Sequence, residues 1–287
     1  MTRPRASAAA ERLESLDVLD PPAQKIGKLV RDAVPDGPVK DGLSGTWLGH
    51  ALHPLLTDIP IGAYTSAVLL DLAGEESAAD KLIAFGLAAT PPVFATGWSD
   101  WADSEMGDAA VRRTGLIHAA LNGTATVLMG ASLVARRGGR RGRGKLLSLA
   151  GMALVGGGGW LGGHLSYARG VGVDTTVFDP DIENWTATEV SESDLADGRA
   201  ACALTDGVPV LLVRRGEQIH ALHDRCSHRG GPLHEGELTE TTVACPWHNS
   251  IFRLEDGSVE QGPATFPQPV FDARLTDGRV EVRRRAR

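Results

Sequence analysis

Four long apolar stretches between Leu55 and Tyr167 constrain the fold more than any other feature of this chain. Each comes close to the roughly 20 residues that a helix needs to cross a bilayer. The last two contain no Asp, Glu, Lys or Arg and show no polar face at helical spacing, which a helix on a soluble protein normally has. The pattern therefore predicts a transmembrane four-helix bundle. Its stretches run from Leu55 to Ala73, from Leu82 to Trp98, from Thr114 to Ala135 and from Leu146 to Tyr167.

The residues within these stretches favour lipid over water as their surroundings. Small residues recur in the fourth stretch, including four consecutive glycines at 156–159, and they allow helices to approach closely in lipid. In a soluble helix each such glycine would cost about 1 kcal/mol relative to alanine. The first two stretches are the weaker candidates, because the first carries Asp58 and Asp71 and the second contains Pro91 and Pro92. The alternative is a soluble, buried four-helix bundle.

After Gly172 the chain becomes acidic and rich in short β-patterned runs. We interpret residues 172–186 as a linker, and residues 187–287 as a small all-β domain of antiparallel sheets. Asp-Gly pairs at 206–207, 256–257 and 277–278 are typical of tight hairpin turns between such runs. The predicted fold class is thus a multidomain α + β chain. The expected strands are Val208 to Val213, Gln218 to His223, Val243 to Ala244, Ile251 to Leu254, and Val270 to Val282 with a break at Asp277.

The first part of the chain, residues 1–45, is expected to form an N-terminal tail. An amphipathic stretch from Ala23 to Val34, bounded by prolines, predicts a helix at the membrane interface, and the alternative is a mobile tail. The opening sequence has neither the apolar segment of a secretory signal nor a twin-arginine pair. The expected organisation is a tail at 1–45, a four-helix transmembrane domain at 46–171, a linker at 172–186 and the β domain at 187–287.

Charge and cysteine content exclude two classes of protein. The net charge is −7 and basic residues gather only in short runs, so nucleic acid is not an expected partner. Three cysteines are too few for a disulfide scaffold, and their number is odd.

Two of the cysteines belong to a spaced motif in the β-patterned region. Cys226 precedes His228 by two residues, and sixteen residues later Cys245 precedes His248 by three. Two thiolates and two imidazoles could bind zinc. Zinc fingers, however, usually pair Cys with Cys and His with His, whereas each segment here supplies one of each. That interleaving suits a two-iron cluster in which the two cysteines hold one iron and the two histidines the other.

The segment carrying this motif resembles a Rieske [2Fe–2S] domain. The match extends through CSHRGGPL and CPWHNSIF to Gly262-Pro263, and it covers about residues 184–284. In the cytochrome bc-type branch of that family, each cluster loop carries a further cysteine and the two form a disulfide. Gly231 and Trp247 occupy those positions here. The resemblance therefore implies the ferredoxin type found with aromatic-ring dioxygenases, and a [2Fe–2S] cofactor.

The resemblance also implies how the surroundings affect this cluster. Without the disulfide, and with Asp224, Glu235 and Glu237 nearby, the reduction potential is expected toward the low end of the Rieske range of about −150 to +300 mV. Ser250 could donate a hydrogen bond to a bridging sulfide, or it could be a solvated loop serine.

Two nearby groups of residues fall outside the motif. Cys202 is expected to be a small buried apolar residue rather than a ligand. His223 and His234 flank the two cluster loops without matching the pattern.

An oxygenase activity of the chain by itself is not expected. Rieske oxygenases add a mononuclear iron held by two His and a carboxylate, in a large domain that follows the cluster. Only residues 249–287 follow His248, and none of them is His. The chain is thus expected to be an electron-transfer component of an oxidoreductase system.

The apolar half resembles an uncharacterised family of predicted four-span bacterial membrane proteins of the DUF2231 type. The resemblance rests on GTWLGHALHPLLTDIPIG, RTGLIHAALNG and GGHLSYARGVGVD, and covers about residues 40–175. It implies a fold rather than a function.

Four histidines of this half are expected at one membrane face if the spans alternate in direction. Ionisable groups at such depth are costly and usually functional, so we hypothesise a site for haem b, a metal or a quinone. Asp58 and Asp100 lie near the same face, and Asn122 could join the site. The alternative is that each histidine binds a helix end at headgroup level. The histidines are His50, His53, His118 and His164.

The distribution of basic residues gives conflicting predictions of the orientation in the membrane. The loop from Arg136 to Lys145 carries six basic residues and should be cytoplasmic, yet residues 1–45 carry seven. Because no signal for exporting a folded cluster domain is present, we expect a cytoplasmic Rieske domain.

The sequence thus predicts a Rieske iron-sulfur protein in the cell membrane that passes single electrons between a reductase and a membrane or oxygenase acceptor. Its expected partners are a redox protein and the lipid bilayer. The alternative is a redox sensor or scaffold that uses the cluster as a switch.

Overall fold

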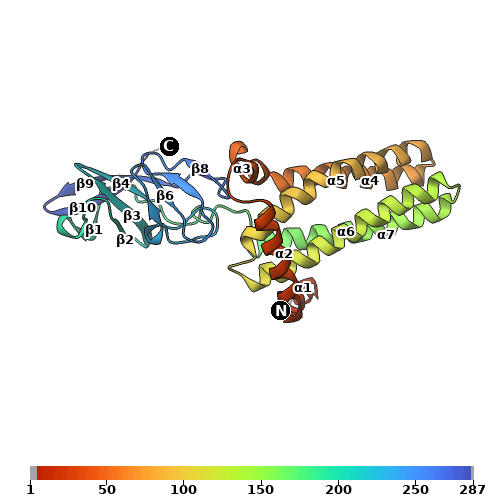
Figure 1. The fold of residues 1–287 in the computed structure, drawn as a ribbon, viewed down its shortest axis with the longest axis horizontal. Helices are drawn as coiled ribbons and strands as arrows, with labels where there is room; N and C mark the ends of the chain where they lie inside the picture. The colour runs from red at the N-terminus through yellow and green to blue at the C-terminus, as the bar shows by residue number, and fades with distance from the viewer. Residues whose placement is uncertain (1–4, 286–287) are drawn as a thin grey trace. The chain divides into compact units, whose positions relative to one another are not determined.

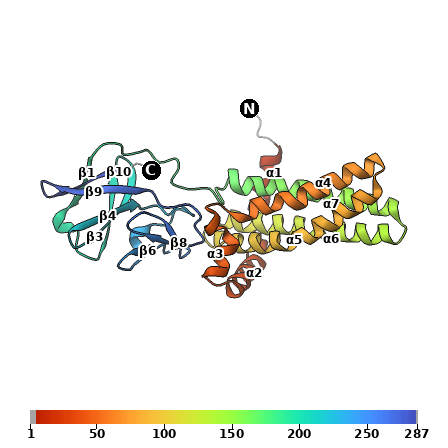
Figure 2. The same ribbon diagram turned by 90° about the horizontal axis from the view of Figure 1, so that it is seen from above.

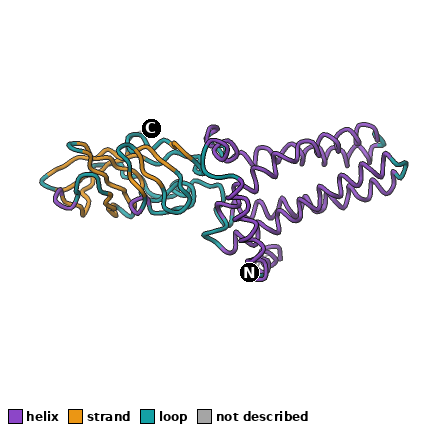
Figure 3. Tube along the Cα trace, in the orientation of Figure 1, coloured by secondary structure: helices purple, strands orange, loops and turns teal. Residues whose placement is uncertain are grey.

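The computed structural model describes residues 5–285, which form two compact units. The helical unit comprises residues 5–34 and 52–171, and the β unit comprises residues 35–51 and 172–285. Figure 3 shows that helices make up the first unit and that strands and loops dominate the second. This confirms the predicted α + β fold class.

Four long helices build the helical unit (Figure 1), and all four are long and apolar enough to cross a membrane. Figures 1 and 2 show them as two hairpins, α4 beside α5 and α6 beside α7. The helix α5 continues through Pro91 and Pro92. The four predicted stretches are therefore helical, each extended by a few residues. Their bounds are Leu52–Ala73 for α4, Glu76–Ser104 for α5, Ala109–Arg137 for α6 and Arg141–Tyr167 for α7.

The outer surface of these helices is apolar. Leu72 is 77% exposed, Val127 70% and Leu146 69%. Between 22 and 28% of the apolar window of each helix is buried inside the protein, so the larger share of each window is at least partly exposed. A large exposed apolar surface is unfavourable in water and favourable in lipid. This favours membrane-spanning helices over the soluble bundle.

Glycines allow neighbouring helices to pack closely, as the sequence predicts. A Cβ atom at Gly86 would lie 2.5 Å from the Tyr64 ring, and one at Gly158 would lie 2.5 Å from the Asn122 amide. Small residues of this kind let helix backbones approach each other in a membrane. The buried core between the helices consists of Tyr64, Ala67, Ala79, Ile83, Ala125, Met129, Leu133 and Val155.

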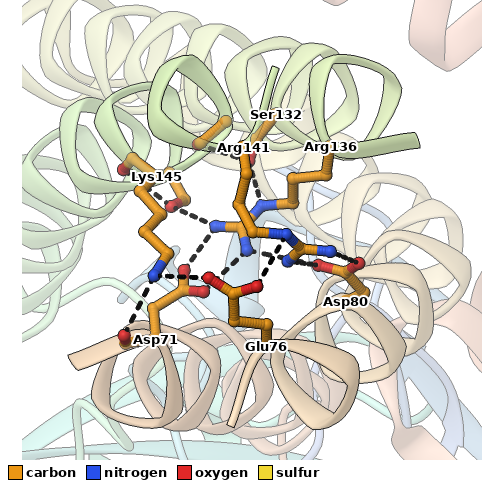
Figure 4. Close-up of polar contacts among 9 residues, drawn as sticks. Asp71, Glu76, Asp80, Ser132, Arg136, Arg141 and Lys145 are labelled. Atoms are coloured by element: carbon orange, nitrogen blue, oxygen red, sulfur yellow. Dashed lines mark hydrogen bonds and ion pairs between the residues drawn. The ribbon is translucent and has the colours of Figure 1, made fainter. Parts of the chain in front are cut away.

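An ion-pair network joins the two hairpins at the end that holds their tight turns (Figure 4). Arg136 on α6 is fully buried, and its guanidinium donates to both carboxylate oxygens of Asp71 on α4, one of them at 2.7 Å. Arg141 Nη2 lies 2.9 Å from Asp80, and Lys145 Nζ lies 2.9 Å from Glu76. Three of the six basic residues in the Arg136–Lys145 loop are thus paired with carboxylates of α4 and α5.

Two short helices precede the long ones and pack on them. They are α1 (Arg5–Glu14) and α2 (Asp20–Ala33), joined by the 3-10 helix η1 (Asp17–Leu19). Arg31 on α2 lies 2.9 Å from Glu105, and Arg113 on α6 lies 2.9 Å from Asp20. The predicted helix over 23–34 therefore forms and is held by ion pairs.

The β unit contains two antiparallel sheets. The larger has the order β1-β10-β9-β4-β3-β2 and the smaller the order β5-β6-β7-β8. The strands are β1 (Thr186–Ser191), β2 (Ala200–Thr205), β3 (Val208–Arg215), β4 (Gln218–His223), β5 (Glu237–Leu238), β6 (Thr242–Ala244), β7 (Ile251–Arg253), β8 (Val259–Gln261), β9 (Val270–Thr276) and β10 (Arg279–Arg284).

All three Asp-Gly pairs lie in turns between antiparallel strands, as the sequence predicts, and in two of them both residues have positive φ. Asp206 and Gly207 have φ values of 50° and 83°, and Asp277 and Gly278 have 51° and 76°. Positive φ at both central residues matches the right-handed twist of the flanking strands. These turns fix the register of β2 with β3 and of β9 with β10.

Residues 35–51, which we name the docking segment, lie on the β unit although they precede the first long helix. The segment contains α3 (Pro38–Ser44) and the 3-10 helix η2 (Thr46–Leu48). The Gly262 N–H donates to Asp41 at 2.8 Å, and Thr46 Oγ1 donates to the Ala264 carbonyl at 3.3 Å. The sequence predicts a domain boundary between residues 45 and 46. The contacts instead group residues 35–51 with the β unit.

Candidate metal centre

Two loops at one end of the β unit carry the spaced Cys and His motif, and they have the same backbone pattern. In the loop after β4, the Cys226 N–H donates to the Gly231 carbonyl, and the Gly230 N–H donates to the Cys226 carbonyl, both at 2.8 Å. In the loop after β6, Cys245 is bonded in the same way to Ser250 and Asn249, at 2.8 and 3.0 Å. Each cysteine thus begins a tight turn closed by two hydrogen bonds.

The two thiols lie together and are buried. Cys226 and Cys245 are each 1% exposed and neither forms a disulfide. The pKa of Cys245 is lowered to about 7, because it accepts a hydrogen bond from the Cys226 thiol and others from the backbone N–H groups of Trp247 and His248. The loop backbone therefore favours a thiolate, which is the form that binds metal.

The two imidazoles of the motif also meet. The ring centroids of His228 and His248 are 5.1 Å apart, with the rings nearly perpendicular. The Nδ1 atom of His228 is buried and has no hydrogen-bond partner within residues 5–285. A buried polar atom without a partner is unfavourable in a folded protein and calls for an explanation such as an ion. The residues present therefore fit a metal group held by two sulfurs and two nitrogens.

Glycine is required where the two loops touch. A Cβ atom at Gly231 would lie 2.8 Å from the Cys245 sulfur and 3.0 Å from the Trp247 ring. Gly231 thus packs against both Cys245 and Trp247 of the other loop.

A buried side chain, that of Gln268, holds the loop after β4 by hydrogen bonds to its backbone. Gln268 is 2% exposed, its Oε1 accepts from the Ser227 N–H at 2.9 Å, and its Nε2 donates to the His223 carbonyl at 2.7 Å. The role of Gln268 cannot be predicted from the sequence, because a single Gln outside the motif gives no local signal.

The sequence left two candidates for the metal group, zinc and a two-iron cluster. Comparison with known proteins favours the cluster. Residues 185–272 match the family described as the Rieske [2Fe-2S] domain. The anthranilate 1,2-dioxygenase ferredoxin subunit of Burkholderia cepacia is 36% identical over 74 residues, which are 26% of this chain and 68% of that protein. This chain belongs to the Rieske [2Fe–2S] family.

The β unit, which we now name the Rieske unit, is similar to further ferredoxins of dioxygenase systems. The 3-phenylpropionate/cinnamic acid dioxygenase ferredoxin subunit of Escherichia coli strain K12 is 33% identical over 91 residues, 31% of this chain and 85% of that protein. Among solved structures, the ferredoxin of carbazole 1,9a-dioxygenase from Nocardioides aromaticivorans IC177 is 22% identical, with a TM-score of 0.34, covering 36% of this chain and 100% of that one.

The helical unit has a match of its own. Residues 49–175 match the family described as a predicted membrane protein (DUF2231). Together with the four apolar helices, this match indicates a multi-pass membrane protein.

The four histidines assigned to one membrane face have different surroundings within their own units. His50 lies in the Rieske unit, where its ring centroid is 6.3 Å from that of Phe266. His164 Nε2 lies 2.8 Å from Glu14, and the ring stacks on Trp160. His53 and His118 lie together in the helical unit, with ring centroids 6.4 Å apart.

One of the two cluster imidazoles is buried, and the docking segment lies near the other. His248 is 8% exposed, and Lys40 of the docking segment lies close enough to His228 to affect its charge. The sequence gives no signal for this contact, because the segment and the cluster loops lie about 200 residues apart along the chain.

Proposed function

We propose that this protein is a membrane-anchored Rieske electron carrier that passes single electrons between a reductase and an acceptor in the membrane or an oxygenase. The observation that carries the proposal is the pair of like loops, which bring two thiols and two imidazoles together and leave the buried Nδ1 of His228 without a partner in the described residues. The cluster, when bound, supplies a one-electron couple.

The protein's own residues would hold and tune this couple. Cys226 and Cys245 would bind one iron, and His228 and His248 the other. The backbone N–H groups of Trp247 and His248 already stabilise negative charge on the Cys245 sulfur. Burial of the thiols excludes water from the sulfur side.

A membrane acceptor is supported by how the Rieske unit is connected. The chain passes between this unit and the helical unit three times, and the segments of the Rieske unit next to these passages bond to the cluster loops or to residues beside them. The docking segment bonds to Gly262 and Ala264, and Thr175 bonds through its N–H and its Oγ1 to Ser227 and Cys226. Related ferredoxin subunits of dioxygenase systems support an oxygenase as the other class of acceptor.

His53 and His118 are our proposed acceptor site within the helical unit. In each ring, Nδ1 lies within hydrogen-bond distance of a backbone carbonyl oxygen. The distance is 3.0 Å from His53 to Val93 and 2.7 Å from His118 to Gly158. If each Nδ1 carries the proton, each Nε2 is the acceptor nitrogen, which is the arrangement of metal-ligating histidines. Haem b, a metal ion or a quinone are the candidate ligands. His50 and His164 are not part of this proposal, because they contact other residues.

We propose a cytoplasmic Rieske unit in a cell membrane. Residues 1–45 carry seven basic residues, and the pairing of Arg136, Arg141 and Lys145 with carboxylates reduces the charge of the opposing loop. Labelling of a cysteine introduced at exposed Glu217 with an impermeant reagent, in intact and in opened cells, tests this orientation. Labelling in intact cells would reverse it.

Low-temperature EPR of dithionite-reduced membranes tests the electron-carrier proposal. We expect the low-average-g signal of a Rieske centre in the wild-type chain and in a His220→Ala control, and its loss in His228→Ala. A silent wild-type spectrum with stoichiometric zinc would refute the proposal. Reoxidation of the reduced cluster in vesicles with and without quinone then tests the membrane acceptor.

Optical spectra of the purified protein test the histidine site separately. A haem band that responds to reductant and disappears in His118→Ala, with the Rieske EPR signal intact, would identify haem. If the protein shows no haem band, no additional metal and no quinone-dependent reoxidation, the proposed histidine site is refuted. The cluster proposal is unaffected by that outcome.

A further inference from the structure

A second group of metal-ligating side chains lies in the Rieske unit, apart from the cluster motif. Cys202 comes from β2, Asp224 directly follows β4, and His234 lies in the 3-10 helix η4 (Leu233–Glu235). One ligand atom from each lies within 4.8 Å of the other two. We name these residues the Cys202 triad. The side chain of Cys202 therefore faces polar ligands rather than the apolar core that the sequence predicts for it.

One distance within the triad matches a zinc site, and the other is the shorter distance of a hydrogen bond. With Zn–S of about 2.3 Å and Zn–O and Zn–N of about 2.1 Å, tetrahedral ligands stand about 3.3 to 3.6 Å apart. The Cys202 sulfur is 3.6 Å from Asp224 Oδ2, and His234 Nδ1 is 2.7 Å from the same oxygen. Small side-chain rotations would thus bring all three atoms to one ion.

The surroundings of the triad hold it in place and leave it accessible. Asp224 is fixed by the His234 backbone N–H, which donates to its Oδ1 at 2.8 Å. The side chain of Asp224 is 5% exposed and that of His234 34%, so the group opens to solvent on the histidine side. His234 Nε2 lies 3.9 Å from Glu235, a carboxylate on the side where metal-ligating histidines usually have one.

We propose that Cys202, Asp224 and His234 bind a Zn²⁺ ion, separate from the iron-sulfur cluster, with water in the fourth position. One thiolate, one carboxylate and one neutral imidazole neutralise the charge of the ion. Binding releases the Cys202 thiol proton to solvent. The proton of a neutral His234 moves from Nδ1 to Nε2, toward Glu235, so nothing is oxidised or reduced.

Metal analysis of the full-length purified protein tests this proposal. After equilibration with zinc and removal of loosely bound metal, we expect one zinc per chain in addition to the cluster iron. Cys202→Ser and His234→Gln should each weaken zinc binding by roughly tenfold or more and leave the iron content unchanged. His220→Gln, which changes another histidine of the same unit outside the triad, serves as the matched control.

Cobalt supplies a second readout, because a thiolate ligand gives Co²⁺ a charge-transfer band that oxygen and nitrogen ligands do not. The band should form in the wild-type and His220→Gln proteins and be absent from Cys202→Ser. Wild-type protein that retains no zinc, or equal zinc binding by the wild-type, Cys202→Ser and His234→Gln proteins, would overturn the assignment. Loss of iron together with zinc in both triad variants would also overturn it, because the metal would then depend on the cluster loops.

Discussion

At the scale of single residues, we expect side chains next to the cluster loops to set the reduction potential of the cluster. Ser250 is fully buried, and its Oγ accepts a hydrogen bond from the Ala264 N–H at 2.9 Å. Because this bond uses an acceptor position of the hydroxyl, the hydroxyl hydrogen stays available as a donor. The solvated-serine alternative from the sequence is therefore wrong, and a bond toward the cluster is the remaining expectation.

Replacement of Ser250 by Ala should lower the reduction potential of the cluster by tens of millivolts, where 59 mV is about 1.4 kcal/mol for one electron. Hydrogen bonds to cluster sulfurs stabilise the reduced, more negative state. An EPR-monitored redox titration measures the shift. Ser258→Ala is the control, since that hydroxyl donates to Asp256 at 2.6 Å. Equal potentials in all three proteins would show that Ser250 does not donate to the cluster.

Lys40 is the second residue for which we expect an effect on the potential. Its side chain is 7% exposed and lies 3.1 Å from Asp36, and its charge acts on His228. Removal of this buried cation in Lys40→Met should disfavour the reduced cluster and lower the potential. The same titration should show no shift in Lys28→Met, whose side chain is 72% exposed on α2. An unchanged potential in Lys40→Met would mean that the docking segment does not act on the cluster.

At the scale of elements, the docking segment depends on a close approach to the loop at residues 262–264. A Cβ atom at Gly262 would lie 2.5 Å from Thr46 Oγ1 and 3.1 Å from Asp41 Oδ1. The second cluster loop adds a contact, because Asn249 Nδ2 donates to Asp36 at 3.0 Å. Glycine at residue 262 thus lets α3 and η2 sit on the Rieske unit.

Gly262→Ala should release the docking segment from the Rieske unit. Hydrogen–deuterium exchange read by mass spectrometry should show faster exchange over residues 38–48 in this variant. Gly42→Ala is the matched control, since a Cβ atom there meets no atom within 4 Å. Unchanged protection in Gly262→Ala would show that the segment is held by other contacts.

The attachment of α1 to α7 should depend on pH through Glu14. Burial raises the pKa of Glu14, but hydrogen bonds from Arg169 and His164 outweigh this and hold the pKa below its ordinary value of 4.5. The stabilisation is therefore present above pH 4.5 and is lost as the pH falls through the lower folded value. Exchange protection of α1, compared with α6 in the same sample, should fall at that pH in the wild type. Glu14→Gln should show weak protection of α1 at every pH.

At the scale of the whole molecule, the ion-pair network of Figure 4 links the α4–α5 hairpin to the α6–α7 hairpin. Arg136 is fully buried and the side chain of Asp71 is 6% exposed, whereas that of Glu76 is 41% exposed. Breaking a buried pair leaves an unpaired charge and costs about 3–5 kcal/mol, while an exposed pair contributes about 0–1 kcal/mol.

Asp71→Asn should therefore lower the melting temperature of the helical unit in detergent clearly more than Glu76→Gln does. The iron-sulfur absorption, followed in the same melt, reports on the Rieske unit and should lose its signal at the wild-type temperature. Similar melting of the two variants would mean that the Arg136–Asp71 pair is not the main link between the hairpins.

Local patterns explain why some of this architecture could be predicted from the sequence. Apolar length predicts α4 to α7, and the Asp-Gly pairs at 206 and 277 predict two hairpins, because both depend on neighbouring residues. The strand β5 has two residues, too few for any alternation to be visible. The contacts of Asp41 and of Cys202 join distant parts of the chain, so no spacing rule reveals them.

The docking segment also orders events during synthesis. Thr46 leaves the ribosome 218 residues before its partner Ala264, which at about 5–20 residues per second is roughly 10–40 s. All four long helices, residues 52–167, are made within that interval. The docking segment is thus already synthesised before the first cluster cysteine is made. A Rieske unit expressed from residue 172 onward would lack that segment, and its Gly262 N–H would lose the Asp41 carboxylate.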